Sequence, residues 1–154
     1  MQNGRRSTEK PAKRRILIVD SHALVRRGLR ALIDNEPDLV VCAEAATYRA
    51  GFEEIAASDP DLTIADLWLG DGDGLALVRD IRARYPRLPV LVITLHDAPV
   101  YARRAFGAGA SGYVTKLEWG ETLLLAMRRV LAGETYMSPA IKVALDTARH
   151  RDLP

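Results

Sequence analysis

The sequence predicts an α/β fold built on a doubly wound parallel sheet. Short apolar runs alternate with segments of helical periodicity, so that the chain contains five successive strand–helix units. The apolar runs lack a polar alternation, which is typical of parallel strands covered by helices on both faces. In a sheet of this kind, functional residues gather where the carboxyl ends of the strands meet.

The five strands are expected at the apolar runs Ile16–Val19, Leu39–Ala43, Leu62–Ala65, Val90–Ile93 and Tyr113–Val114. The helices are expected to follow them, over 23–35, 47–58, 73–85, 97–109 and 119–132. The first, third and fifth of these segments place their apolar residues on one helical face, whereas the second and fourth have weaker stripes.

Capping and stop residues support the helix boundaries. Thr47 can cap the second helix, and Pro60 and Pro86 block extension of the second and third. Glycines end the fourth, and Gly133 can serve as the end cap of the fifth.

Length and composition indicate one soluble domain. The chain has 154 residues, a single cysteine and no apolar run of the ~18 residues that a membrane span needs, so a disulfide framework and a membrane location are excluded. Without an apolar signal segment, a cytoplasmic location is expected. Residues 1–15 hold six of the 22 Lys and Arg but one of the 20 Asp and Glu, so the basic character belongs to the N-terminal segment. We expect it to be a solvated tail.

Four polar residues stand at the ends of the predicted strands. Asp20 ends the first strand, Asp66 the third, Thr94 the fourth and Lys116 the fifth. Each alone could be an ordinary strand end or a helix cap. Together, two carboxylates, a hydroxyl and an ammonium supply the groups that phosphoryl transfer requires: a nucleophile, a seat for Mg²⁺ and partners for phosphoryl oxygens.

These residues lie in stretches that resemble the response regulator receiver domains of two-component signalling. The matching stretches are ILIVD, PDLTIADLWLGDGDG, PVLVITLHD and GAGASGYVTK, and they cover about residues 14 to 133. VRRGLRALI and LLLAMRRVLAGETYMSP are similar to the NarL/FixJ-type (LuxR-type) subgroup. The resemblance implies a flavodoxin-like (βα)5 fold, with a five-stranded parallel sheet in the order 2-1-3-4-5.

The resemblance also implies residue roles and partners. Asp66 would accept a phosphoryl group from a histidine kinase or a phosphotransfer protein, and Thr94 and Lys116 would contact that group. Asp20, Asp66 and the backbone carbonyl of Trp68 would hold Mg²⁺. Thr94 and Tyr113 would form the switch. The face made by the fourth helix, fifth strand and fifth helix would bind partners, including a second copy in a homodimer.

Ser21 departs from the family pattern, in which a second acid follows the first strand. That member of the pair would be the more direct metal ligand, and a neutral hydroxyl cannot replace its charge. A loss of about 1–3 kcal/mol in Mg²⁺ binding is expected, so the magnesium site is predicted to be weakened. Ser21 could equally cap the following helix.

Other motifs are set aside. GAGASG, over 107–112, matches G-x-G-x-x-G, but it follows a helix and opens a strand, so dinucleotide binding is rejected. GDGDG, over 70–74, is interpreted as a flexible loop over the site. His22 and His96 are expected to face solvent, with a metal role as the alternative.

Three parts of the chain are predicted: a basic flexible tail at 1–13, a receiver domain at 14–133 and a C-terminal extension at 134–154 with one helix. The extension is too short for the helix-turn-helix domain usual in this subgroup, so we expect either a stand-alone receiver or a fragment, without DNA binding of its own. The predicted function is phosphorelay signalling rather than enzymatic catalysis. A pseudo-receiver that binds proteins without phosphorylation is the alternative, and a nucleotide- or flavin-binding enzyme is not supported.

Overall fold

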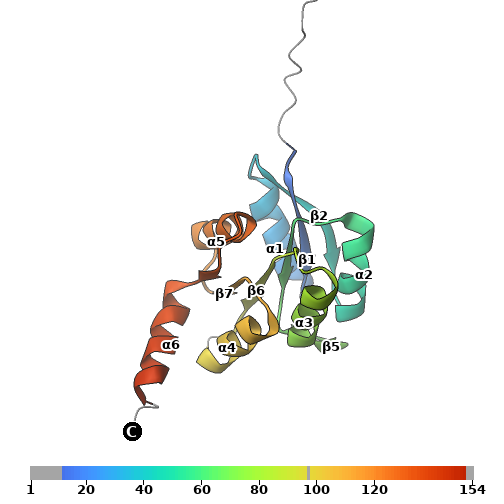
Figure 1. Cartoon of the computed structure of the whole chain (residues 1–154). Coiled ribbons are helices and arrows are strands. Elements are labelled where there is room, and N and C mark those ends of the chain that lie inside the picture. The colour runs from blue at the N-terminus through green and yellow to red at the C-terminus, as the bar shows by residue number, and fades with distance from the viewer. Residues whose placement is uncertain (1–11, 97, 152–154) are drawn as a thin grey trace, which may run out of the picture.

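The computed structural model describes residues 12–96 and 98–151. One sheet contains the strands β1 (Arg14–Val19), β2 (Leu39–Ala45), β3 (Leu62–Ala65), β6 (Val90–Thr94), β7 (Gly112–Thr115) and β8 (Tyr136–Met137). A separate ribbon contains β4 (Trp68–Leu69) and β5 (Gly72–Asp73). The helices are α1 (Ala23–Asp34), α2 (Tyr48–Ser58), α3 (Gly74–Arg84), α4 (Pro99–Ala108), α5 (Glu121–Leu131) and α6 (Pro139–Arg151). Figure 1 shows their arrangement.

The predicted α/β fold is confirmed, with one correction to the sheet. The strands run in the order β2-β1-β3-β6-β7-β8, and every pair is parallel. The first five positions reproduce the predicted order 2-1-3-4-5. The prediction of five strands is wrong, because β8 adds a sixth beside β7, with Tyr136 opposite Gly112. A strand of two residues is too short to leave a periodic signal in the sequence.

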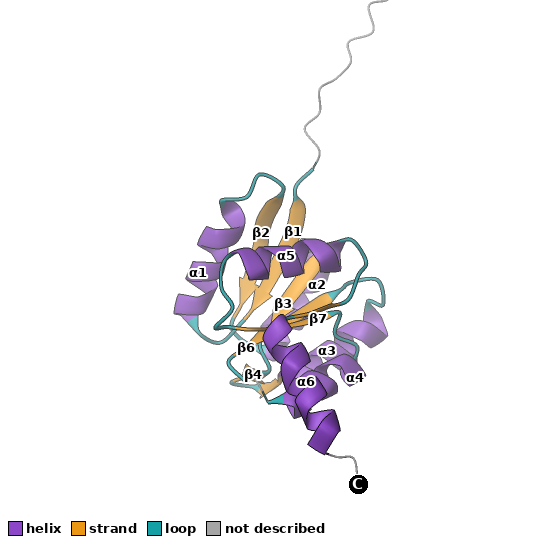
Figure 2. Ribbon diagram, turned by 90° about the vertical axis from the view of Figure 1, so that its left-hand side faces the viewer, coloured by secondary structure: helices purple, strands orange, loops and turns teal. Residues whose placement is uncertain are grey.

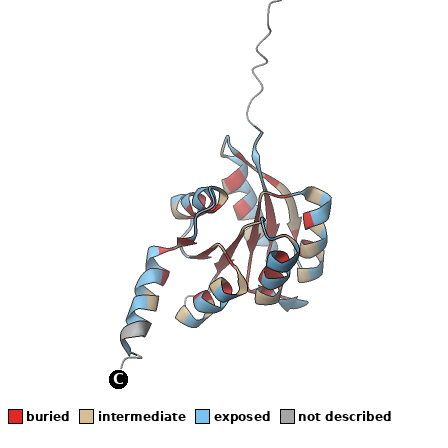
Figure 3. Ribbon diagram, in the orientation of Figure 1, coloured by how far each residue is buried: buried red, intermediate tan, exposed pale blue. Residues whose placement is uncertain are grey.

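Helices cover both faces of the sheet, and the alternation of side chains along β1 explains why. Ile16 and Ile18 pack in a cluster with α1 and α5, whereas Leu17 and Val19 pack in a second cluster with α2, α3 and α4. Both faces of the strand are therefore buried, as the unbroken apolar run predicted. Figures 2 and 3 show α5 across one face and the buried strands between the helical layers.

The residues that begin and end the helices agree with most of the predicted boundaries. Thr47 caps α2, its hydroxyl accepting a hydrogen bond from the Ala50 amide at 3.1 Å, and Gly133 follows α5 with a φ of +88°. The predicted capping role of Ser21 is wrong. His22, not Ser21, occupies the N-cap position of α1, and it makes no side-chain cap; its amide donates to the carboxylate of Asp20 at 2.8 Å.

The segment expected to be a flexible loop forms the β4–β5 ribbon. Trp68 pairs with Asp73 and Leu69 with Gly72 in an antiparallel arrangement. The carboxylate of Asp73 then accepts the amide of Leu75 at 2.8 Å and so caps α3. Gly74 returns the chain against the end of β3, where its amide donates to the Leu67 carbonyl at 2.9 Å.

The C-terminal segment packs against the domain. The Ser138 amide donates to the Tyr113 carbonyl at 3.3 Å, which joins the start of α6 to β7. Ile141 of α6 is fully buried in the cluster that contains Ala102 and Ala105 of α4. The extension thus forms one helix and one short strand, and α6 lies beside α4. Most of the predicted basic tail, residues 1–11, lies outside the described residues.

Membrane-spanning character is not found in the part of the chain that the structure describes. None of its helices has both the length and the apolar composition that a span requires.

We expect Gly74→Ala to destabilise the domain. A Cβ at this position would lie 2.2 Å from the Asp66 carbonyl oxygen and 2.6 Å from the Leu67 Cα, so backbone must move. The free energy of unfolding should fall by at least about 2 kcal/mol in urea titrations. The control is Gly70→Ala, in the same ribbon, where a Cβ meets nothing within 4 Å. Equal stability of the two variants would contradict the close approach.

Candidate functional site

The sheet brings the four predicted strand-end residues to one edge. Asp20 and Asp66 follow β1 and β3, and the Asp66 amide donates to the Val19 carbonyl at 3.0 Å. Thr94 ends β6, and the Lys116 amide donates to the Thr94 carbonyl at 2.8 Å. These backbone hydrogen bonds continue the parallel ladders past the last strand residues, so the side chains start from adjacent positions.

Lys116 joins the two carboxylates. Its Nζ lies 2.7 Å from Oδ2 of Asp20 and 2.8 Å from Oδ2 of Asp66. The side chains are almost inaccessible, at 6% for Lys116 and 4% for each aspartate. Burial that deep requires pairing, and one ammonium between two carboxylates leaves a formal charge of −1. The site therefore retains negative charge that can attract a cation.

Burial and pairing act in opposite directions on Lys116. Desolvation alone would lower its pKa, but the hydrogen bonds to Asp20 and Asp66 more than offset this and raise the pKa above its ordinary value. The ammonium is therefore protonated throughout the neutral range.

The second oxygen of each carboxylate is also engaged. Oδ1 of Asp66 accepts the Leu67 amide at 2.7 Å, and Oδ1 of Asp20 accepts the His22 amide at 2.8 Å. These contacts fix the orientation of both side chains. The Arg26 guanidinium donates to the Asp20 backbone carbonyl at 2.6 Å and adds a further cation behind the strand end.

The backbone carbonyl of Trp68, which was predicted to hold Mg²⁺, lies beside Ser21. Its backbone oxygen lies 3.5 Å from the Ser21 hydroxyl, a long hydrogen bond that links the ends of β1 and β3. Two buried carboxylates and one backbone carbonyl are the oxygen donors that Mg²⁺ takes, together with water. The residues present therefore fit a magnesium ion, although Ser21 contributes a neutral hydroxyl.

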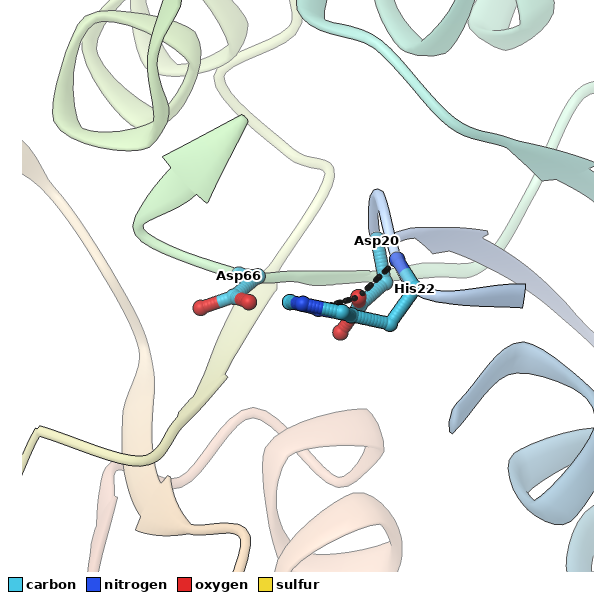
Figure 4. Close-up of side chains that lie close together, drawn as sticks. All are labelled: Asp20, His22 and Asp66. Atoms are coloured by element: carbon cyan, nitrogen blue, oxygen red, sulfur yellow. Dashed lines mark hydrogen bonds and ion pairs between the residues drawn. The ribbon is translucent and has the colours of Figure 1, made fainter. Parts of the chain in front are cut away.

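His22 lies closer to the site than the sequence indicated. Its ring is 64% exposed, as expected of a solvent-facing histidine, yet Nδ1 lies 3.3 Å from Oδ1 of Asp20. Ligand atoms of Asp20, His22 and Asp66 all lie within 4.8 Å of one another. Figure 4 shows the imidazole beside the two carboxylates.

The two predicted switch residues are both buried. The Thr94 hydroxyl accepts the His96 amide at 3.4 Å. The Tyr113 ring is fully buried and its hydroxyl donates to the His96 carbonyl. Thr94 and Tyr113 are thus connected through one residue, His96.

An aromatic group lies beside the site, and the sequence did not indicate that His96 and Tyr101 join Trp68 in it. The rings of Trp68, His96 and Tyr101 lie together, with centroids 5.0 Å apart for Trp68 and His96 and 5.2 Å apart for His96 and Tyr101. Trp68 follows Asp66 by two residues and remains half exposed, so the group borders the acceptor edge. Tyr101 carries no sequence signal for this role, because its position depends on how α4 docks.

A hollow of about 1120 Å³ lies at the opposite edge of the sheet, near the starts of β1, β3 and β6. Among its charged side chains, Arg14 pairs with Asp61 at 3.7 Å and Arg82 donates to the Pro86 carbonyl at 3.3 Å, and the four predicted strand-end residues do not line it. We therefore place the functional site at the carboxyl edge.

The fold and the site together define a receiver-type signalling domain. Residues 16–128 match the response regulator receiver domain family. The chain belongs to this family, and the predicted resemblance is confirmed.

Relatives of the NarL and LuxR type support the subgroup. The chain is 36% identical over 131 residues to the DNA-binding transcriptional activator DevR/DosR of Mycobacterium tuberculosis, covering 85% of this chain and 60% of that protein. It is 33% identical over 132 residues to the oxygen regulatory protein NreC of Staphylococcus haemolyticus, covering 85% and 61%. The chain thus spans about three fifths of the length of these relatives.

Solved structures agree with the fold. A LuxR-family two-component response regulator from an Aurantimonas species is similar with a TM-score of 0.86 at 37% identity, over 90% of this chain and 99% of that one. The isolated receiver domain of RcsB from Salmonella enterica, at 22% identity, has a TM-score of 0.81 over 86% and 99%. At that identity the second comparison supports the fold alone.

We expect Lys116→Met to destabilise the domain at neutral pH in the presence of a chelator. The variant leaves two buried carboxylates without their shared cation, at a cost of about 3 kcal/mol in the free energy of unfolding. Added Mg²⁺ should restore part of the loss, because it supplies positive charge at the same place. Lys142→Met, which removes an exposed lysine of α6, is the control. A stable Lys116→Met protein that does not respond to Mg²⁺ would contradict this account.

Proposed function

We propose that this domain accepts a phosphoryl group on Asp66 from a histidine kinase or a phosphotransfer protein. The observation that carries the proposal is the Lys116 ammonium, 2.8 Å from Oδ2 of Asp66 and 2.7 Å from Oδ2 of Asp20. A cation at that distance can stabilise charge on an incoming phosphoryl group. Family membership supports the same reaction.

The transfer balances as a substitution at phosphorus. A carboxylate oxygen of Asp66 forms the new O–P bond while the bond from phosphorus to the donor histidine nitrogen breaks. That nitrogen keeps the bonding electron pair and takes a proton. The product is an acyl phosphate on Asp66, whose phosphoryl oxygens need donors and cations around them. Lys116 and the Thr94 hydroxyl are the candidates for two of these contacts.

Mg²⁺ would be held by Asp20, Asp66 and the Trp68 carbonyl, and it would neutralise charge on the phosphoryl oxygens. Ser21 weakens this site in our proposal. With an acid at this position the site would carry one more negative charge. Two unit charges about 4 Å apart interact by up to about 4 kcal/mol at an effective dielectric of 20, and a net loss of about 1–3 kcal/mol remains after desolvation.

The aromatic group of Trp68, His96 and Tyr101 supports slow phosphorylation of Asp66 and slow hydrolysis of its acyl phosphate. Trp68, two residues after Asp66, meets His96 edge to face, and in our proposal these rings restrict the approach of a donor or of water to Asp66. We propose that both phosphorylation and hydrolysis of the acyl phosphate are slow as a result.

The proposed partner surface is the face made by α4, β7 and α5, including its use in a homodimer. In this structure α6 lies beside α4 and β8 pairs with β7, so α6 either takes part in that surface or must move away from it. The exposed Leu125 of α5 and Val143 of α6 are available for such contacts. We propose that residues 14–133 do not bind DNA themselves and work in the cytoplasm, where a kinase can reach them. The relative DevR/DosR is a DNA-binding activator.

One observation favours the alternative of a pseudo-receiver. Lys116 pairs with both carboxylates, and Ser21 links β1 to the Trp68 carbonyl, so groups of the chain itself hold this edge together. A domain of that kind would bind its partner without phosphorylation of Asp66.

Incubation with acetyl phosphate and Mg²⁺ should add one phosphoryl group to the protein, measured by intact mass. Asp66→Asn, which keeps the shape but lacks the nucleophile, should add none. Asp66→Asn should still unfold in one cooperative urea transition, which excludes loss of fold as the cause. Failure of the wild-type protein to gain mass at any Mg²⁺ concentration would favour the pseudo-receiver.

Restoring the acid with Ser21→Asp should strengthen Mg²⁺ binding by about 5- to 150-fold, because it returns one negative charge beside Asp20. The Mg²⁺ concentration that gives half-maximal phosphorylation should fall by the same factor. Ser21→Asn, similar in size but neutral, is the matched control. If both variants behave like the wild type, the serine costs little.

A further inference from the structure

The residue that follows Ser21 offers the site a donor that is not an oxygen. His22 places an imidazole nitrogen 3.3 Å from Oδ1 of Asp20, and one ligand atom from each of Asp20, His22 and Asp66 falls within 4.8 Å of the others. In Figure 4 the imidazole points toward the two carboxylates rather than away from them.

The backbone holds His22 in this position. Its amide donates to the same Asp20 carboxylate at 2.8 Å, and its φ and ψ of −91° and 110° keep it extended at the start of α1. Only side-chain torsions therefore separate the ring from the carboxylates. Ligand atoms bound to one ion at about 2.1 Å lie up to about 4.2 Å apart, so shifts of a few tenths of an ångström would bring all three to the ion.

The ligand preferences of each metal ion determine which ion an additional imidazole would bind more tightly. Mg²⁺ takes oxygen ligands and keeps its waters, so a neutral imidazole does little for it. First-row transition ions accept imidazole nitrogen together with carboxylate oxygen, and Mn²⁺ combines this with a preference for carboxylate and carbonyl donors. Ser21 brings no charge to the site, and the next residue, His22, offers an imidazole.

We propose that His22 is a ligand of the divalent ion at this site and that the site binds Mn²⁺ in preference to Mg²⁺. This inference rests on the proposed function of the same site, because it concerns the ion that would accompany phosphorylation of Asp66. It differs from that proposal in assigning a role to His22 and in the class of metal.

The test is metal binding to the full chain without a phosphoryl donor. Mn²⁺ binding is followed by the loss of the electron paramagnetic resonance signal of free Mn²⁺, and Mg²⁺ binding by its competition with bound Mn²⁺. His22→Phe keeps a ring without a nitrogen, and His22→Ala removes the ring. His96→Ala is the control, because His96 lies at the same edge but outside the cluster.

Loss of a group that merely supports a metal ligand costs 10- to 100-fold in affinity, so removal of the ligand itself should weaken Mn²⁺ binding at least about tenfold. Mg²⁺ affinity should stay within about twofold. Bound Mn²⁺ should show nitrogen hyperfine coupling in the wild type and in His96→Ala, and none in either His22 variant. Equal Mn²⁺ affinity in wild type and His22 variants, or bound Mn²⁺ without nitrogen coupling, would overturn the inference.

The two proposals fail separately. If His22 is not a ligand, the acetyl phosphate experiment on Asp66 is unaffected. If Asp66 is never phosphorylated, the affinities and the nitrogen coupling still report whether His22 binds the ion.

Discussion

The bridge from Lys116 to Asp20 and Asp66 is the interaction on which the carboxyl edge of the sheet depends. Parallel strands in the order β2-β1-β3-β6-β7 bring the ends of β1 and β3 side by side, so two carboxylates meet where little water reaches them. Without a cation their repulsion would oppose the strand order that creates the site. Lys116 relieves that repulsion, and since desolvation works against its own charge, the two aspartates are equally necessary to the lysine. Fold and site are therefore linked by one buried set of charges.

The same arrangement explains why the backbone near the site is so tightly constrained. The chain leaving Asp66 turns through the β4–β5 ribbon and returns at Gly74, where no side chain fits against the Asp66 carbonyl. This return holds the Trp68 carbonyl near Ser21 and places the Trp68 ring against His96. Positions that contact neither carboxylate thus determine the shape of the donor set around them.

The sequence predicted the parts of this structure that depend on period and on strand ends. Unbroken apolar runs predicted the parallel sheet. The polar residues at the ends of those runs, Asp20, Asp66, Thr94 and Lys116, predicted the site. The two-residue strands β4, β5 and β8 were missed because a periodic pattern needs more residues. The capping role of Ser21 was wrong because α1 begins one residue later, with His22 at the N-cap position. The closeness of His22 and the packing of Tyr101 depend on side-chain torsions and helix docking, which no local pattern encodes.

A continuous set of contacts runs from the site to the C-terminal helix. The Thr94 hydroxyl accepts the His96 amide, and the His96 carbonyl accepts the Tyr113 hydroxyl. The Tyr113 carbonyl in turn accepts the amide of Ser138, at the start of α6. Contiguity alone does not establish coupling, which requires an element with two arrangements that both sites bias. In the proposed function the Thr94 side chain moves to donate its hydroxyl hydrogen to a phosphoryl oxygen on Asp66. This movement draws the hydroxyl oxygen away from the His96 amide and loosens the residue that holds Tyr113. Because the carbonyl of Tyr113 also anchors α6, the docking of this helix is the element whose two arrangements phosphorylation would bias.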